Sequence, residues 1–184
     1  MSLEATKELA PTGVLRAAIN MSNFLLVTGK TAAGEPDGVS PDMARELAKR
    51  LNVELELLQY KTPGEVSDDA GKGIWDIGNI GAEPKRAERI DFTAAYCEIQ
   101  STYMVPPGSE ITSLEQVDQK GIRIAVSARS AYDLWLERNI KNAELVRVDG
   151  IDASFDVFME RKLEALAGLR PRLITDVKQV PGAK

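Results

Sequence analysis

The chain has 184 residues, of which 43% are hydrophobic and 28% are charged, so it can fold around a sizeable core. Its net charge of −5 argues against a nucleic-acid partner, which would require a basic surface. It has no histidine and one cysteine, which excludes imidazole catalysis, histidine-ligated metals and an intramolecular disulfide; we expect neither a metal nor a cofactor. No apolar run could span a membrane. Scattered basic residues such as Arg170 and Arg172 are expected on solvated faces, and Cys97, after an aromatic residue, is expected to be buried.

Strand and helix patterns alternate along the first half of the chain. Val14–Asn20 is predicted to be a buried strand, followed by a glycine-containing loop. A helix is expected in "SPDMARELAKRLN", with Ser40 as its N-cap, Pro41 at its first position, and an apolar stripe formed by Met43, Ala44, Leu47, Ala48 and Leu51. The next expected elements are a strand in "VELELLQY", a short helix opened by the capping box "TPGE", a strand in "WDIGNI", a helical turn from Pro84, and a strand in "IQSTYMV".

After "PPGSE" the pattern begins again. The expected elements are a second capping box in "TSLE", a strand in "GIRIAVS", a helix in "SAYDLWLERNI" with Ser130 as its N-cap, a strand in "AELVRV", a helix in "DASFDVFMERK" with Phe155, Phe158 and Met159 inward, a strand in "LEALAGL" and a helix in "RPRLITDV". Helical crossovers between strands indicate an α/β protein with mainly parallel sheets flanked by helices. The restart predicts two lobes, residues 1–107 and residues 108–184.

The edges of these sheets predict where a ligand would bind. In parallel sheets, ligands bind outside the carboxyl ends of the strands, next to helix N-termini. This rule selects residues 20–24, 79–86 and 127–132. Within the second segment, Arg86 follows a Gly-Ala-Glu-Pro turn, and either a surface ion pair with Glu83 or Glu88 or an anion-binding site would explain it.

Five segments in register resemble a known family: "GVLRAAIN", "GVSPDMARELAKRL", "GIWDIGNIGAEPKRAERIDFTAAY", "YMVPPGSEITSLEQV" and "GIRIAVSARSA". They are similar to the family-3 extracellular solute-binding proteins, the amino-acid receptors of ABC importers. The resemblance implies a two-lobed, periplasmic-binding-protein-like (type II) fold that closes on a small molecule, and a membrane component of an ABC transporter as partner. It also implies an exported, periplasmic protein whose signal peptide has been removed; because "MSLEATKEL" has no signal-peptide pattern, a cytoplasmic location stays open.

The resemblance also implies a set of binding residues. Arg86 matches the family's arginine that grips the ligand's carboxylate, and Ser130 and Ala131 match the carboxylate-binding turn of the second lobe. The remaining positions expected to line the site are Asn20, Asn23, Phe24, Asn79, Gly81 and Glu83.

Three departures from the family pattern bear on the ligand. Gly81 and Glu83 stand at the family's two threonine positions, and Leu169 stands where the family has the aspartate that takes the ligand's α-ammonium group. Either Glu83 supplies the missing counter-charge, or the ligand is a carboxylate without an ammonium group. The chain also ends at "KQVPGAK", before the family's return segment, so the second lobe is expected to be incomplete at its C-terminus.

The leading hypothesis is therefore a non-enzymatic binding protein that captures an amino acid or related organic acid between its lobes. An alternative is an enzyme resembling cyclohexadienyl dehydratases, in which Glu83 would act as an acid with a raised pKa. A further alternative is a ligand-sensing domain.

Overall fold

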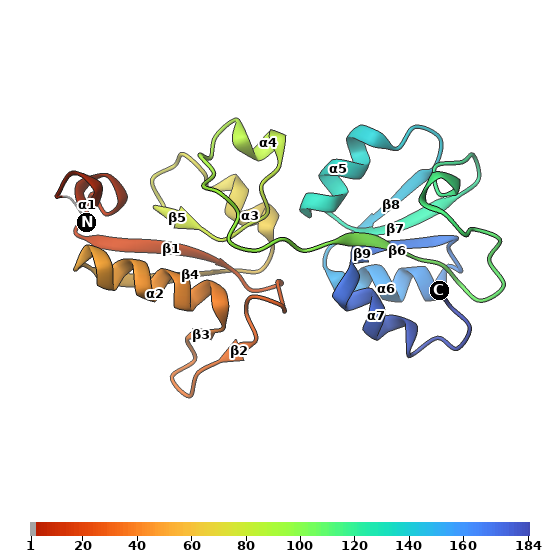
Figure 1. Ribbon diagram of the computed structural model, residues 1–184, viewed down its shortest axis with the longest axis horizontal. Helices are drawn as coiled ribbons and strands as arrows, with labels where there is room; N and C mark the ends of the chain where they lie inside the picture. Colours follow the sequence, from red (N-terminus) through yellow and green to blue (C-terminus); the bar gives the residue numbers. More distant parts are fainter. Residues whose placement is uncertain (1–2) are drawn as a thin grey trace. The chain divides into compact units, whose positions relative to one another are not determined.

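The computed structural model describes residues 3–184, which form two compact units (Figure 1). The first unit ends at Phe92, and the second comprises Thr93–Lys184. The sequence predicted the boundary after residue 107. The boundary lies earlier because strand β6 (Ser101–Met104) pairs with strand β9 (Ala165–Leu169) and so belongs to the second sheet. Within the described residues no helix is long and apolar enough to cross a membrane.

The first unit is built around a parallel sheet with the strand order β4-β1-β5. Its elements in chain order are α1 (Leu3–Leu9), β1 (Val14–Asn20), the hairpin strands β2 (Gly29–Lys30) and β3 (Pro36–Asp37), α2 (Val39–Leu51), β4 (Glu54–Tyr60), α3 (Pro63–Asp68), β5 (Ile77–Gly78) and α4 (Pro84–Ala87). Strand β1 has the predicted bounds, and the capping box of α3 is confirmed: Thr62 Oγ1 accepts a hydrogen bond from Glu65 N.

Side chains on both faces of β1 are buried, because helices cover both faces of the sheet (Figure 1). Leu15, Ala17 and Ile19 pack with residues of α2, while Ala18 lies on the other face, close to Val66 of α3 across Gly78. This double burial explains the nearly continuous apolar run of the strand.

Helix α2 begins earlier than predicted, at Val39, and its N-cap is Gly38 rather than Ser40. The backbone of Gly38 has φ 126°, and a Cβ atom there would lie 2.7 Å from Leu26 O, so only glycine fits this position. Ser40 lies inside the first turn and donates its N–H to Leu26 O. Ala44, Ala48 and Leu51 are buried as predicted, whereas the prediction was wrong for Met43, which is 46% exposed.

The second unit is built around a four-stranded sheet with the order β6-β9-β7-β8, in which only the edge strand β6 is antiparallel. Its elements after β6 are the 3₁₀ turn η1 (Leu114–Gln116), β7 (Arg123–Ser127), α5 (Ala131–Asn139), β8 (Glu144–Val148), α6 (Ile151–Glu160), β9 (Ala165–Leu169) and α7 (Arg170–Val177). The second capping box lies one residue later than predicted, from Ser113 to Gln116, because the Gln116 side chain reaches back to the N–H of Ser113.

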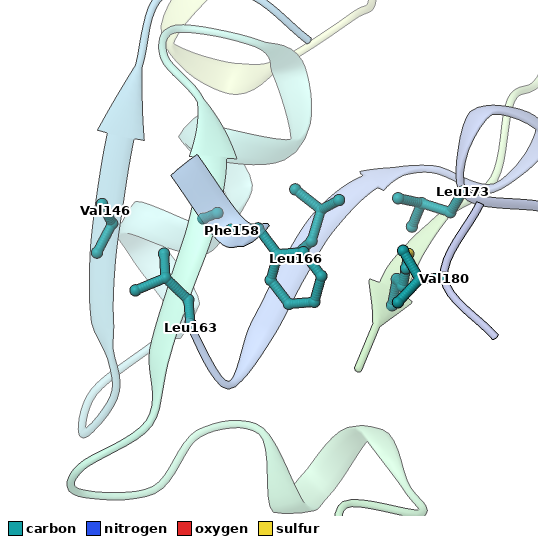
Figure 2. Close-up of a cluster of buried hydrophobic side chains, with 8 residues drawn as sticks. Val146, Phe158, Leu163, Leu166, Leu173 and Val180 are labelled. Atoms are coloured by element: carbon teal, nitrogen blue, oxygen red, sulfur yellow. The ribbon is translucent and has the colours of Figure 1, made fainter. Parts of the chain in front are cut away.

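The larger core of the second unit lies between its sheet and helices α6 and α7 (Figure 2). Figure 2 shows side chains from β8, α6, β9 and α7 in this core. Phe158 of α6 is 2% exposed. The buried members of this cluster are Met104, Ala125, Val146, Phe158, Leu163, Leu166, Leu173 and Val180. Phe155 and Phe158 face inward as predicted, but Met159 is 41% exposed and does not.

The segment that joins the two halves of the chain also differs from its prediction. In the described structure residues 91–100 belong to no helix or strand, and Cys97 is exposed rather than buried. The aromatic neighbour Tyr96 is itself 47% exposed, so the apolar surroundings expected for the thiol are not formed.

The two units repeat one arrangement, which confirms that the pattern begins again in mid-chain. In each, a central strand (β1 or β7) lies between two parallel neighbours (β4 and β5, or β8 and β9). In each, an arginine at the start of the central strand holds an acid at the start of a neighbour: Arg16 with Asp76, and Arg123 with Glu164. We call each pair an arginine clasp. Both clasps lie at the amino ends of the strands, opposite the carboxyl ends where ligands bind in such sheets.

Candidate functional site

At the carboxyl end of β1, the predicted site residues form a compact turn. Asn20 is the last residue of the strand and is 7% exposed; its Oδ1 atom accepts hydrogen bonds from Ser22 N (3.2 Å) and Ser22 Oγ (2.8 Å). Asn23 N donates to Asn20 O at 3.2 Å, and Asn23 Oδ1 accepts from Leu25 N at 3.3 Å. These bonds fix the backbone and leave Phe24 37% exposed, so its ring is accessible for stacking.

Asn79 follows the neighbouring strand β5 and fastens it to the start of α2. Its N–H donates to Ala18 O of β1 at 3.4 Å, and its Nδ2 atom donates to Ser40 O at 3.0 Å. Asn79 therefore holds the loop after β5 against the first turn of α2, at the carboxyl end of β1.

The turn that leads into α4 carries the two charged residues of the predicted site. Glu83 is the N-cap of α4, is 5% exposed, and accepts a hydrogen bond from Lys85 N at 2.9 Å. Arg86 is 3% exposed, and its Nη1 atom donates to Gly81 O at 2.8 Å. The guanidinium group of Arg86 is therefore withdrawn from solvent, as is the carboxyl group of Glu83. A guanidinium group in such surroundings interacts strongly with a carboxylate.

In the second unit, the predicted residues lie in the loop from β7 to α5. Ser130 is confirmed as the N-cap: its Oγ atom accepts a hydrogen bond from Asp133 N at 3.1 Å. Ala131 is the first residue of the helix. Arg129 has a left-handed backbone (φ 59°), and its N–H donates to Asp133 Oδ2 at 2.7 Å. Asp133 thus holds the loop from inside the helix, while its Oδ1 atom accepts from Arg147 Nε at 2.8 Å.

Two further residues lie at this edge that the sequence did not identify as site residues. The hydroxyl group of Tyr132 interacts with the hydroxyl groups of Ser127 and Ser130; burial raises the pKa of Tyr132. Arg172, in the first turn of α7, is 23% exposed; the predicted solvated face holds only in part, because the side chain is also paired with Asp176 and Asp152. The spacing of Arg172 and Asp176, one helical turn apart, was the sequence signal that could have shown this pairing.

The sequence-predicted residues therefore occupy the predicted sheet edges. Seven lie at the carboxyl edge of the first sheet, namely Asn20, Asn23, Phe24, Asn79, Gly81, Glu83 and Arg86, and two, Ser130 and Ala131, lie at that of the second. Leu169 ends β9, as the sequence comparison with the family assumed, so no acid stands at the end of that strand. Among residues 3–184 no group of three or more cysteine, aspartate or glutamate side chains could hold a metal ion.

Comparisons with known proteins agree with this arrangement. The model of the bacterial extracellular solute-binding proteins, family 3, matches residues 18–179. The L-cystine-binding protein TcyJ of Escherichia coli K12 is 25% identical over 134 residues, which cover 72% of this chain and 50% of the relative, so the chain spans about half the length of that protein. The cyclohexadienyl dehydratase of Pseudomonas aeruginosa is 27% identical over a region that covers 92% of this chain and 68% of the relative.

Solved structures show the same fold. The cysteine-binding protein of Campylobacter jejuni has a TM-score of 0.74 at 22% identity, covering 98% of this chain and 73% of that chain. An ancestral arginine-binding protein bound to arginine has a TM-score of 0.73 at 23% identity, covering 94% and 77%. The predicted type II periplasmic-binding-protein-like fold is thereby confirmed.

Proposed function

Because this chain belongs to family 3 of the bacterial extracellular solute-binding proteins, we propose that it captures a small, polar, carboxylate-bearing ligand for an ABC importer in the periplasm. The ligand class is an amino acid or a related organic acid. The names of the relatives support this class, since they bind cystine, cysteine or arginine. Binding of this kind needs no catalytic group.

The observation that carries the proposal is the burial of Arg86. A guanidinium group that is 3% exposed, in the helical turn α4 that follows strand β5, is arranged to bind a carboxylate with little competition from water. In this proposal Gly81 O orients the guanidinium group through the 2.8 Å bond from Nη1. Asn20, Asn23, Phe24, Asn79 and Glu83 complete the first unit's part of the site.

The second unit contributes the start of α5. The N–H groups of a helix N-terminus attract anions, and Ser130 and Ala131 occupy that start. Ser130 Oγ accepts from Asp133 N, and its hydroxyl group also interacts with that of Tyr132, so the backbone N–H groups at the start of α5 are the part proposed to bind a ligand oxygen.

A dehydratase-like enzyme is the second candidate, favoured by the 27% identity to a cyclohexadienyl dehydratase. Its catalytic acid would be Glu83, which is 5% exposed. This carboxyl group is the N-cap of α4 and accepts a hydrogen bond from Lys85 N at 2.9 Å. Mixing the protein with a carboxylated cyclohexadienyl substrate, and measuring aromatic product, distinguishes the two functions.

A thermal-shift panel tests the binding function. It compares α-amino acids with plain mono- and dicarboxylates, using the unsubstituted protein, Arg86→Ala, and Arg89→Ala as a matched control, because Arg89 is exposed and only three residues away. A ligand present at 100 times its dissociation constant stabilises the folded protein by about 2.7 kcal/mol. We expect a shift that Arg86→Ala abolishes and Arg89→Ala retains. A folded protein that no carboxylate stabilises, or a shift that Arg86→Ala leaves unchanged, would contradict the proposal.

A further inference from the structure

The carboxyl edge of the second sheet presents three helix N-termini in succession. Helices α5, α6 and α7 each begin within a few residues of the ends of β7, β8 and β9. In the described chain, α6 and α7 begin without a side-chain hydrogen bond to their first turn. Their N–H groups therefore leave a positive potential at this edge, which favours an anion over a cation.

Arg172, in the first turn of α7, adds a formal positive charge at the same edge. Its Nε atom donates to Asp176 Oδ1 at 2.8 Å, and its Nη1 atom donates to Asp152 Oδ1 at 2.6 Å. Its Nη2 atom donates to no protein atom within residues 3–184 and is not enclosed. The guanidinium group thus has one edge fixed and one edge available.

The two carboxylates that hold Arg172 differ in their surroundings. The side chain of Asp176 is 1% exposed, so it is a permanent partner that orients the guanidinium group. The side chain of Asp152 is 86% exposed, and an ion pair with so exposed a partner contributes little to stability. Another carboxylate that approaches from solvent can therefore take the place of Asp152 on Nη1 and Nη2 at small cost.

Hydroxyl groups complete the surroundings of this guanidinium group. Arg172 lies near enough to Tyr132 for its charge to act on the phenol, and that phenol interacts with the hydroxyl groups of Ser127 and Ser130. Ser127 is the last residue of β7 and is 7% exposed. Hydroxyl donors beside a guanidinium group form a site suited to an oxyanion.

The same edge offers little to an ammonium group. Leu169, at the end of β9, carries no charge. Asp133 is engaged by Arg129 N and Arg147 Nε, and Asp176 by Arg172. The exposed acids at this edge are Asp149, in the loop from β8 to α6, and Asp152, which is paired with Arg172; tighter binding of the α-amino acids would show that they attract the ammonium group.

We propose that Arg172, Tyr132 and Ser127 form an anion subsite in the second unit, and that the ligand is an organic acid with a second anionic group rather than a zwitterionic α-amino acid. The second anionic group displaces Asp152 from Arg172. This inference rests on the proposed binding function, because it concerns the ligand of that same site.

Isothermal titration calorimetry with ligands matched in length tests the inference. The probes are succinate and glutarate, their monocarboxylate counterparts butyrate and valerate, and the α-amino acids 2-aminobutyrate and norvaline. The variants are Arg172→Gln, Asp152→Asn and, as a control with the same charge change at the opposite end of α6, Arg161→Gln. The highly exposed Asp152 allows a variant that leaves the fold intact.

We expect the dicarboxylates to bind more tightly than the other probes of equal length. Arg172→Gln should weaken their binding about 10- to 100-fold, the loss expected for a hydrogen bond between charged groups, and leave the monocarboxylates unchanged. Asp152→Asn should tighten dicarboxylate binding about 2- to 5-fold, because the competing carboxylate is gone, and Arg161→Gln should change neither.

Tighter binding of the α-amino acids than of the dicarboxylates would overturn the inference, as would dicarboxylate binding that Arg172→Gln leaves unchanged. In either case carboxylate binding that depends on Arg86 would persist, so the proposed function would stand. Absence of binding by every probe, together with a silent thermal-shift panel, would refute both.

Discussion

The two arginine clasps are expected to differ in strength although they have the same geometry. Asp76 accepts hydrogen bonds from Arg16 N (2.8 Å), Nε (3.0 Å) and Nη2 (2.6 Å). Glu164 accepts the corresponding bonds from Arg123 N (2.9 Å), Nε (2.9 Å) and Nη2 (2.8 Å). Replacing each acid by its amide, Asp76→Asn and Glu164→Gln, removes the charge and one acceptor in both units, and so compares the two clasps directly.

Burial sets the expected magnitudes. The side chain of Asp76 is 6% exposed, whereas that of Glu164 is 33% exposed. Breaking a buried ion pair costs about 3 to 5 kcal/mol when a partner is removed, while a solvent-exposed pair is worth about 0 to 1 kcal/mol. Because the amide keeps its carbonyl oxygen, we expect Asp76→Asn to lower the free energy of unfolding by about 3 kcal/mol, and Glu164→Gln by about 1 kcal/mol.

The assay uses the two tryptophans, one in each unit. Trp75 lies in the first unit, where its Nε1 atom donates to Val66 O at 3.1 Å, and Trp135 lies on α5 of the second. Urea unfolding followed by fluorescence in Trp135→Phe and Trp75→Phe backgrounds then reports each unit separately. Each amide variant is compared with its own single-tryptophan parent.

The reasoning would be refuted if Glu164→Gln destabilised its unit as much as Asp76→Asn destabilises the other. Equal losses would mean that the number of hydrogen bonds, and not burial, determines the strength of the clasp. A change in the slope of the urea dependence, rather than in its midpoint, would indicate an altered unfolded state and is checked in the same data.

Three other predictions concern the core, the pH dependence and the exposed thiol. Phe158→Ala should destabilise the second unit by about 3 to 5 kcal/mol, measured by urea unfolding, and a loss below 1 kcal/mol would contradict the close packing around this ring. Burial raises the pKa of Asp76, but the hydrogen bonds from Arg16 outweigh this effect and hold the pKa below the ordinary 3.8. The stabilisation by the clasp is therefore complete above pH 3.8 and is lost as the pH falls through the lowered pKa. Asp76→Asn should flatten the acid side of a curve of unfolding free energy against pH. Cys97 should react with a thiol reagent in the folded protein within about tenfold of its rate in urea, since it is exposed, and strong protection would show that another segment covers it.

Much of the fold could be predicted because the governing signals are local. The strand β1 and the helix α7 have the predicted bounds, the first from a continuous apolar run and the second from Pro171 in its first turn. The start of α2 was missed because Gly38 is required there by a contact with Leu26, twelve residues earlier, which no local pattern reveals. Met43 and Met159 fit the helical period, but tertiary packing leaves them exposed.

In the candidate site, too, residues with a local sequence signal could be predicted and residues placed by tertiary contacts could not. Arg86, Glu83 and Ser130 were identifiable because each stands at a strand end or a helix start along the chain. The role of Arg172 was not, because its contact with Asp152 and its proximity to Tyr132 arise from the lateral order of β7, β8 and β9. That order brings together residues from three separate loops.

The placement of the clasps allows ligand specificity to change separately from the stability of the sheets. The residues that fasten neighbouring strands lie at one end of each sheet, and the residues proposed to contact a ligand lie at the other end of the same strands. Substitutions at Leu169, Arg172 and the turn before α4 can therefore alter specificity while both clasps stay intact. Such a scaffold is tolerant of new specificities, whether they arise by evolution or are introduced by engineering at Leu169, Arg172 and the turn before α4.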